Sequence, residues 1–257
     1  MIGCLFDSDS HHARQAFCEL SELYDITDIS VDGGLCFDVI LTLGGDGMML
    51  RALHKFIGLN IPIFGMNRGS LGFLLNKYSS ENMIERIRNS VPVELHPLEM
   101  QVLTDDGELI KAIAVNEVSV LRQLHQAANL RIYIDGKLRL GKLVSDGILV
   151  STPAGSSAYN YAAGGNIIPL SANVVALTPI SPFRPRSWRS VLLSNKSIIE
   201  IEVLEHQKRQ ISAVADFTEV RNAVKVKIFQ RNDIKLTILS DSNDNLEDRM
   251  LQEQFYT

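Results

Sequence analysis

The sequence has few of the features that mark secreted, metal-bound or membrane-inserted proteins. Its 257 residues include three cysteines, Cys4, Cys18 and Cys36, an odd number with no C-x-x-C pair. A disulfide framework and a zinc site are therefore not expected. No apolar run reaches the roughly 18 residues that a membrane helix needs, and the first residues lack the basic stretch of a secretory signal. We expect a cytoplasmic protein with no membrane partner.

Positive charge is also scarce. Lys and Arg number 25 against 30 Asp and Glu, which gives a net charge of -5. This balance offers no electrostatic footprint for DNA or RNA, so no nucleic-acid partner is expected. The chain does have 46% hydrophobic and 21% charged residues. Such a composition argues against disorder and is sufficient for one large domain or two smaller ones with packed cores.

The chain changes its pattern near residue 92. Before that point, short apolar runs alternate with helical patterns, which predicts an α/β domain with parallel strands and crossover helices. Ser80 is expected to cap the last helix of this part. The expected strands and helices cover residues 2–6, 12–24, 39–43, 47–57, 61–64 and 81–89.

From residue 93 to about 240 the pattern becomes strand–turn–strand. Asp105-Asp106-Gly107 and Asp135-Gly136 are turn signals between alternating runs. The alternation predicts a β-rich domain over residues 93–240. A helical pattern at 244–255 is expected to return to the first domain, which then comprises residues 1–92 and 241–257.

The most informative segment is residues 38–47. An apolar run of Val, Ile and Leu ends in Gly44-Gly45-Asp46-Gly47, and a helix-like stretch begins at Met48. A buried strand that delivers a glycine-lined acidic turn to a helix start can bring backbone N–H groups and one carboxylate up to a phosphate. Nucleotide phosphoryl chemistry is therefore the first hypothesis.

Two further segments have a functional and a structural interpretation. Residues 65–74 contain three glycines within eight residues, which permits close approach of a ligand but is also typical of a plain glycine-rich loop. Asn116 and Glu117 interrupt an apolar run. Asn can donate and accept hydrogen bonds and Glu only accepts them, a pair suited to an adenine edge and ribose hydroxyls. Equally, one of the two side chains could be solvated and the other could make a turn contact.

Residues 145–159 form the strongest segment after the first. An acidic turn at Asp146 leads into a strand, then a Pro/Gly break and a helix start made of small residues. Small side chains let a flat ring or a sugar lie against the backbone, Tyr159 offers a stacking face, and Ser157 or Asn160 a hydrogen bond. The alternative is a tightly packed strand–helix corner.

Together these segments resemble the NAD kinases, ATP-dependent enzymes that phosphorylate NAD at the 2′-hydroxyl of its adenosine ribose. The glycine–Asp block alone is shared with diacylglycerol kinases, sphingosine kinases and phosphofructokinases, but the chain lacks the Gly-Thr-x-Asn-Asp-Phe element of lipid kinases. The resemblance comes from an ordered set: Gly44–Gly47, Asn67-x-Gly69-x-Leu71-Gly72-Phe73-Leu74, Asn116-Glu117, Asp146 and Ser151-Thr152-Pro153-Ala154-Gly155-Ser156-Ser157-Ala158-Tyr159.

The resemblance implies an α/β + β fold. An N-terminal Rossmann-like or flavodoxin-like parallel-sheet domain would be followed by a C-terminal β-sandwich-like domain that supplies most of the NAD site. It also implies NAD and ATP as substrates and self-association as a homodimer or homotetramer. The cofactor is a divalent metal, Mg²⁺, carried with ATP; no prosthetic group and no protein-held metal are expected.

The resemblance also assigns residues position by position. Asp46 matches the catalytic base, Gly47 a backbone contact to the dinucleotide, and Arg51 a basic residue near phosphate. The remaining binding residues are Asn116 and Glu117 for the nicotinamide-side ribose, Asp146 for the nicotinamide end, and Ala154, Ser157, Ala158, Tyr159, Asn160, Tyr161 and Ala162 for the adenosine pocket.

Three positions depart from the family pattern. Ser157 stands where Thr is common and keeps the hydroxyl, whereas Ala162 stands where Ser is frequent and loses it. Phe217 stands where a glycine usually follows the Asp, so Asp216 is not included in the expected site.

Other classes of protein remain open. A lipid or sugar kinase with the same glycine block would phosphorylate a different acceptor, and an NAD-sensing module would bind NAD without consuming ATP. Asp46 favours an enzyme, because a sensor needs no carboxylate at the reacting sugar. An interaction protein is least favoured, because the polar clusters follow strand ends.

Overall fold

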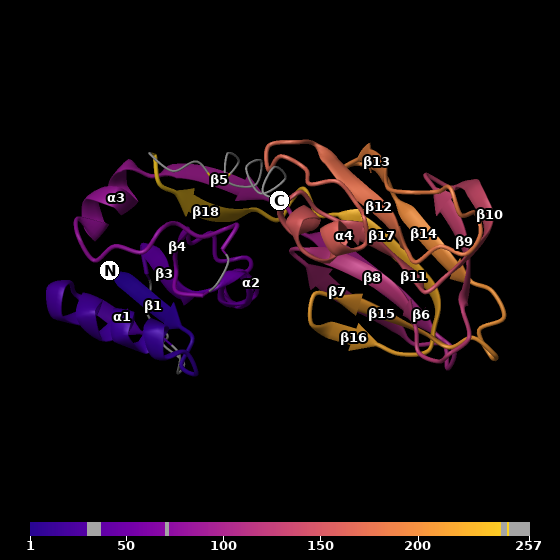
Figure 1. Cartoon of the computed structure of the whole chain (residues 1–257), viewed down its shortest axis with the longest axis horizontal. Helices are drawn as coiled ribbons and strands as arrows, with labels where there is room; N and C mark the ends of the chain where they lie inside the picture. Colours follow the sequence, from indigo (N-terminus) through magenta and orange to yellow (C-terminus); the bar gives the residue numbers. More distant parts are fainter. Residues whose placement is uncertain (30–36, 70–71, 243–245, 247–257) are drawn as a thin grey trace. The chain divides into compact units, whose positions relative to one another are not determined.

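Figure 1 shows the computed structural model of the chain, which describes residues 1–29, 37–69, 72–242 and 246. Packing divides the chain into two units, Met1–Leu95 with Ile234–Thr257, and His96–Asp233. Cys36 and, apart from Leu246, the helix expected at 244–255 lie outside the described residues. Among the described residues, no helix has the length and hydropathy of a membrane span.

The first unit alternates strands and helices around a six-stranded sheet of order β2-β1-β3-β4-β18-β5. Strands β1 to β4 run parallel, β18 is parallel to β4, and β5 is antiparallel to β18. The predicted α/β architecture is confirmed. The elements are β1 (Ile2–Phe6), α1 (His11–Leu23), β2 (Ile26–Asp28), β3 (Val39–Gly44), α2 (Asp46–Lys55), β4 (Ile63–Asn67), α3 (Met83–Asn89), β5 (Val91–Leu95) and β18 (Leu236–Ser240).

The helices α1, α2 and α3 lie on both faces of the sheet. Successive strand residues point to opposite faces. On one face, Leu41 of β3 shares a core cluster with Leu20 of α1 and Met83 of α3. On the other, α2 lies so close to β4 that a Cβ on Gly65 would lie 2.5 Å from the Met49 Cε atom. Glycine at position 65 therefore has a packing reason.

The start of α3 corrects the expectation for Ser80. The helix begins at Met83, and its N-cap residue is Asn82, with φ 51°. The Met83 N–H donates to the Tyr24 hydroxyl at 3.2 Å, and this hydroxyl donates to the Ser80 carbonyl at 2.7 Å. A tyrosine from the end of α1 thus supplies the cap, because tertiary packing brings it to the helix start.

The second unit is a β-sandwich. Its two six-stranded antiparallel sheets have the orders β10-β9-β14-β17-β6-β7 and β13-β12-β11-β8-β15-β16 and enclose one apolar core. The elements are β6 (Leu98–Thr104), β7 (Leu109–Ala114), β8 (Glu117–Arg122), β9 (Ala128–Ile134), β10 (Lys137–Ser145), β11 (Gly147–Ser151), the 3-10 helix η1 (Ala154–Ser157), α4 (Tyr159–Ala162), β12 (Val174–Ile180), β13 (Val191–Ser194), β14 (Ile199–Val203), β15 (Ile211–Ala215), β16 (Thr218–Val220) and β17 (Ala223–Gln230).

Local turn chemistry shapes this unit as the sequence predicts. Asp135 and Gly136 join β9 to β10 with φ values of 53° and 72°, the left-handed pair of a type I′ hairpin turn. The chain enters the unit after β5 and leaves it before β18, and these two strands pair with each other in the first unit. The packing boundaries at residues 95/96 and 233/234 differ by three and by seven residues from the pattern boundaries at 92/93 and 240/241.

Candidate active site

In the first unit, the glycine–Asp turn connects β3 directly to α2. Gly45 is the N-cap residue, and Asp46 is the first residue of the helix. A Cβ on Gly44 would lie 2.7 Å from the Met48 Cβ, so glycine there serves packing. A Cβ on Gly47 would meet no atom within 4 Å. Only Gly47, of these two glycines, faces space that another molecule can enter.

The Asp46 carboxylate is held in place by the second glycine-rich segment. Its Oδ2 accepts the Phe73 N–H at 2.9 Å, and its Oδ1 accepts the Leu74 N–H at 3.0 Å. The positive end of the α2 dipole also favours a negative charge at this position. The structure therefore brings the two glycine-rich motifs together at one half-buried carboxylate.

The glycines of the second segment have packing reasons. A Cβ on Gly69 would lie 3.1 Å from the Gly45 Cα, and one on Gly72 would lie 2.9 Å from the Asn67 Cγ. The Asn67 Oδ1 also accepts the Gly69 N–H at 2.8 Å. The loop thus folds tightly against the glycine–Asp turn. Ser70 and Leu71 of this motif lie outside the described residues.

Arg51 lies on the exposed side of α2. It lines a cavity of about 260 Å³ together with Lys55 and with Asp7 and Asp9 from the end of β1. Two basic side chains there face acidic ones, so the cavity has no net excess of positive charge. Within this unit, Asp46, Gly47 and Arg51 all come from α2.

In the second unit, three neighbouring strands bring the other candidates together. Glu117 at the start of β8 pairs with Ser151 at the end of β11. On the other side of β8, Asp216 follows β15 and donates its N–H to the Glu117 carbonyl at 3.2 Å. The Asn116-Glu117 pair therefore lies between two strand ends.

Asp216 is a residue that the sequence analysis left out of the site. Its carboxylate accepts the N–H groups of Val115 at 2.6 Å, Asn116 at 3.0 Å and Glu117 at 3.1 Å. It adopts φ 51°, a left-handed conformation that Asp tolerates better than most residues. The sequence did contain a signal for Asp216, namely an Asp in a tight turn between two short strands. It was not used because Phe217 stands where a glycine usually follows this Asp.

The turn after β11 packs on the carbonyl groups of residues 115–116, whereas Asp216 holds the N–H groups of the same segment. The Thr152 hydroxyl donates to the Val115 carbonyl at 2.6 Å and accepts the Gly155 N–H at 3.1 Å. A Cβ on Gly155 would lie 2.3 Å from the Asn116 carbonyl oxygen. The segment is therefore a tightly packed corner, and this packing places η1 and α4 next to the Asn116-Glu117 pair.

The candidates on η1 and α4 differ in what they can contact. Asn160 is fully buried; its Nδ2 donates to the carbonyls of Ser156 at 3.1 Å and Asn166 at 2.9 Å, and its Oδ1 accepts the Thr178 hydroxyl at 2.6 Å. This side chain anchors the corner. Ala154 is buried and Ser157 half-buried, whereas the exposed candidates are Ala158, Tyr159, Tyr161 and Ala162.

Acidic groups and unsatisfied acceptors gather beside Tyr159. Burial, and then the nearby Asp216 carboxylate, raise the pKa of Glu117 to about 7. The pKa of Tyr159 is also raised, first by burial and then by the carboxylates of Glu117 and Asp146. Among the described residues, the buried Asn116 Oδ1 and Glu117 Oε2 have no hydrogen-bond partner. Buried acceptors normally have partners, so the cluster is suited to donors such as ribose hydroxyls.

Asp146 is oriented by an ion pair. Its Oδ1 accepts from the Arg122 Nε at 2.6 Å, and its carbonyl accepts the Arg122 N–H at 3.0 Å. Both side chains remain about one-third exposed, so the pair contributes orientation more than stability. In the second unit, the structure thus brings together Asn116, Glu117, Asp146 and Tyr159.

Replacing Glu117 with Gln is expected to raise the free energy of unfolding at high pH and to change it by less than about 1 kcal/mol near pH 5. Because the folded pKa of about 7 exceeds the ordinary 4.5, stability is present at low pH and is lost as the pH rises through 7. Gln stays neutral throughout, so the variant gains up to about 3 kcal/mol over the original chain at pH 9. Urea unfolding at pH 5 and pH 9 measures this.

The control for that measurement is Glu108→Gln, at an exposed turn position. It is expected to unfold like the original chain at both pH values. An identical pH dependence of the original chain and Glu117→Gln would contradict the assignment of Glu117.

Comparison with known proteins points to one family along the chain. Residues 15–91 match the family model described as ATP-NAD kinase N-terminal domain, and residues 115–229 match the ATP-NAD kinase C-terminal domain. The NAD kinase of Rhizobium meliloti is 50% identical over 218 residues, which cover 85% of each chain. That of Caulobacter vibrioides is 48% identical over 248 residues, which cover 96% of this chain and 94% of the relative.

Two solved structures have the same fold. Yeast NADH kinase complexed with NADH gives a TM-score of 0.84 at 20% identity, covering 99% of this chain and 86% of that one. An NAD kinase from Archaeoglobus fulgidus in complex with ATP gives 0.78 at 23% identity, covering 98% of each. From the matches of both domain models and the identity to its curated relatives, the chain belongs to the NAD kinase family.

Proposed function

We propose that this chain transfers the γ-phosphoryl group of ATP to the 2′-hydroxyl of the adenosine ribose of NAD, giving NADP and ADP. Family membership supports the reaction. The observation that carries the residue assignment is the Asp46 carboxylate, which stands at the start of α2 and is held by the N–H groups of Phe73 and Leu74.

The chemistry asks for positioning and charge control. A ribose hydroxyl is a poor nucleophile, the γ-phosphate is strongly anionic, and the transition state is loose. Asp46 accepts or orients the 2′-hydroxyl proton while the new O–P bond forms and the bond to the ADP oxygen breaks. The N–H groups of Phe73 and Leu74 orient the Asp46 carboxylate, and an ionised carboxylate can accept the hydroxyl proton because it is an acceptor only.

The candidates of the second unit bind the dinucleotide in this proposal. The unsatisfied oxygens of Asn116 and Glu117 accept the hydroxyls of the nicotinamide-side ribose, and Asp146 faces the nicotinamide end. Tyr159 presents a partly exposed ring for stacking. The adenosine pocket is lined by Ala154, Ser157, Ala158, Tyr161 and Ala162, and the buried Asn160 holds that lining in place.

Mg²⁺ would enter with ATP, and it would supply charge neutralisation at the phosphates. A metal held by substrate phosphates and water needs few protein ligands. Among the described residues, no three His, Cys, Asp or Glu side chains gather as a metal cluster, so no residue is assigned to the ion. Arg51 is proposed to contact phosphate. We also propose that the chain self-associates as a homodimer or homotetramer and acts in the cytoplasm.

A coupled assay tests the reaction. The purified protein is incubated with ATP and MgCl₂ and with either NAD or diacylglycerol, and NADP is measured with an NADP-specific dehydrogenase. NADP is expected to form only when both NAD and ATP are present. Phosphorylation of the lipid would indicate a lipid kinase. Thermal stabilisation by NAD without ATP consumption would indicate a sensing module, and either result would contradict the proposal.

Gly47→Ala is expected to weaken NAD binding without harming the fold. A Cβ at this helical position meets no atom within 4 Å, so stability stays the same or rises by up to about 1 kcal/mol. A methyl group in the path of the dinucleotide raises the KM for NAD about tenfold, which corresponds to about 1.4 kcal/mol. Steady-state kinetics and thermal unfolding of the same preparation measure both effects.

Gly141→Ala is the matched control, since a Cβ on Gly141 also meets nothing within 4 Å and β10, on which it lies, contains none of the assigned residues. It is expected to leave the KM unchanged. An unchanged KM in Gly47→Ala would remove Gly47 from the binding site.

A further inference from the structure

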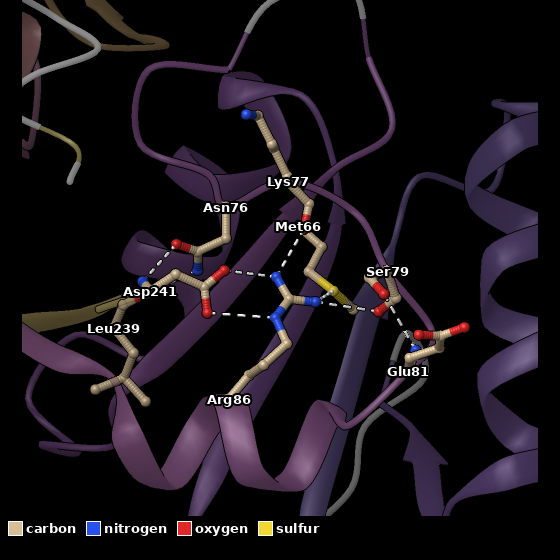
Figure 2. Close-up of polar contacts among 8 residues, drawn as sticks. All are labelled: Met66, Asn76, Lys77, Ser79, Glu81, Arg86, Leu239 and Asp241. Carbon is tan, nitrogen blue, oxygen red and sulfur yellow. Dashed lines mark hydrogen bonds and ion pairs between the residues drawn. The ribbon is translucent and has the colours of Figure 1, made fainter. Parts of the chain in front are cut away.

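A polar cluster centred on Arg86 holds the residues that directly follow the second glycine-rich segment (Figure 2). Its guanidinium donates to the Asp241 carboxylate, from Nη2 to Oδ2 at 2.6 Å and from Nε to Oδ1 at 3.3 Å. It also donates to the carbonyls of Lys77 at 2.7 Å and Ser79 at 3.2 Å. The Met66 sulfur lies 3.5 Å from Nη1. One side chain of α3 thus joins β4, the loop at residues 77–79 and the segment after β18.

The Arg86–Asp241 pair is better explained by the backbone groups that it positions than by a contribution to the free energy of unfolding. The side chains of Arg86 and Asp241 are only 19% and 14% exposed. Replacing a buried ion pair with well-packed apolar groups is often neutral or stabilising, because removing two charges from water offsets most of their attraction. A guanidinium, however, presents its donors in a rigid planar fork. Arg86 is therefore suited to fixing several backbone groups relative to one another.

Asn76 completes the cluster and is 1% exposed. Its Nδ2 donates to the Leu239 carbonyl at 2.9 Å, and its Oδ1 accepts the Asp241 N–H at 2.9 Å. Its backbone N–H donates to the Gly65 carbonyl at 2.8 Å, and its carbonyl accepts the Asn67 N–H at 2.8 Å. Residue 76 is thus tied to β4 through its backbone and to the end of β18 through its side chain.

The tied segment leads directly to the proposed catalytic residue. Phe73 and Leu74 donate their N–H groups to the Asp46 carboxylate, and Asn76 follows Leu74 by two residues. Two residues of chain span at most about 7 Å, so there is little slack between the two anchors. The positions of the Phe73 and Leu74 N–H groups that hold Asp46 are therefore set by the anchored Asn76 and by the Arg86–Asp241 pair.

We propose that Arg86, with Asp241 and Asn76, positions the Asp46 carboxylate for phosphoryl transfer by fixing residues 73–79. This inference rests on the function proposed for Asp46. Arg86, Asp241 and Asn76 are positioning residues and touch no substrate in this account. A purely structural role would reduce the amount of folded protein, whereas a positioning role lowers the turnover of the folded protein.

Arg86→Lys tests the positioning role by kinetics. Lys keeps a positive charge opposite Asp241 but cannot reproduce the fork that reaches the carbonyls of Lys77 and Ser79. The kcat is expected to fall about tenfold, while the KM for NAD stays within about twofold, because the dinucleotide contacts remain. Arg88→Lys, at an exposed position of the same helix, is the matched control and is expected to leave both parameters unchanged.

A double-mutant cycle separates this inference from the proposed function. If Arg86 acts through Asp46, Arg86→Lys lowers kcat less than about twofold once Asp46 is already Asn. The same tenfold loss in both backgrounds would overturn the inference and leave the role of Asp46 intact. An unchanged kcat in Asp46→Asn alone would overturn the proposed role of Asp46 instead, on which this inference rests.

Amide hydrogen exchange supplies a readout independent of activity. In Arg86→Lys, the amides of Phe73 and Leu74 are expected to exchange about tenfold faster, while those of Leu41 and Leu43 in β3 stay protected. Asp241→Asn, which keeps the shape of the acceptor and removes its charge, serves as a second variant if Arg86→Lys folds poorly. Unchanged exchange at Phe73 and Leu74 in the folded variants would overturn the proposal.

Discussion

Asp46→Asn is expected to lower the turnover number for NAD phosphorylation by about a hundredfold or more, the usual size of general acid–base assistance. Asn keeps the size of the side chain but loses the charge. One of its two terminal groups becomes an NH₂ that faces the N–H of Phe73 or Leu74, so one hydrogen bond of the loop is lost as well. The fall in kcat therefore combines lost proton acceptance with a less well-placed acceptor.

The two contributions can be separated by measuring stability alongside kinetics. Loss of one backbone hydrogen bond changes the free energy of unfolding by about 1–3 kcal/mol and leaves the folded fraction near unity in a protein of ordinary stability. Asp105→Asn, at an exposed turn of the second unit, is the control and is expected to keep its turnover. Near-normal turnover in Asp46→Asn would remove the proposed role of the carboxylate.

Asp216→Ala is expected to lower the free energy of unfolding of the second unit by about 3–5 kcal/mol. The substitution leaves the N–H groups of Val115, Asn116 and Glu117 without their acceptor, and an unsatisfied buried donor costs about 1–3 kcal/mol. Alanine is also disfavoured at φ 51°. Burial, the larger cause of the raised Glu117 pKa, remains in this variant, but the pKa is expected to fall in part because the like charge of Asp216 is removed.

Urea unfolding followed by tryptophan fluorescence measures this loss. Trp188 is the one tryptophan of the chain and lies in the second unit, so its signal reports that unit. Asn222→Ala is the control for backbone conformation, since Asn222 also has a positive φ, of 55°, and no role is assigned to its side chain. Its free energy of unfolding is expected to fall by about 1–2 kcal/mol. An equal loss in the two variants would show that the Asp216 carboxylate does not hold the Asn116-Glu117 segment.

Local patterns were sufficient for the elements of the fold. The apolar run at residues 39–43 became β3, the helical pattern at 12–24 became α1, and Asp135-Gly136 formed the expected hairpin turn. In each case the signal lies in neighbouring residues, because strand and helix periods and left-handed turn residues are local properties. The α/β and β-sandwich architecture followed from how these patterns alternate.

Residues that act at a distance were beyond the reach of the sequence. Tyr24 caps α3, and Asp216 holds residues 115–117, with sequence separations of 59 and up to 101. The residues around α3 do not indicate Tyr24, and the residues around 115–117 do not indicate Asp216. The glycines show the same limit: for residues 65–74 the sequence left ligand approach and a plain glycine-rich loop as alternatives. In the structure, a Cβ on Gly44, Gly69 or Gly72 would meet protein atoms, whereas one on Gly47 would meet nothing within 4 Å.

The ligand roles of the site residues remain predictions. The structure adds to them a reason why each side chain stands where it does, such as the N–H pair at Asp46 and the unsatisfied acceptors at Asn116 and Glu117. It also supplies two sets of supporting residues, around Asp216 and around Arg86, that the motifs did not include.

A crystal structure of this chain with NAD bound would show whether the Asp46 carboxylate faces the hydroxyl that accepts the phosphoryl group. We expect the 2′-oxygen of the adenosine ribose to lie about 2.6–3.2 Å from an Asp46 carboxylate oxygen, with the Phe73 and Leu74 hydrogen bonds to that carboxylate kept. A bound dinucleotide whose 2′-hydroxyl contacts another side chain, with Asp46 out of hydrogen-bond reach, would contradict this expectation.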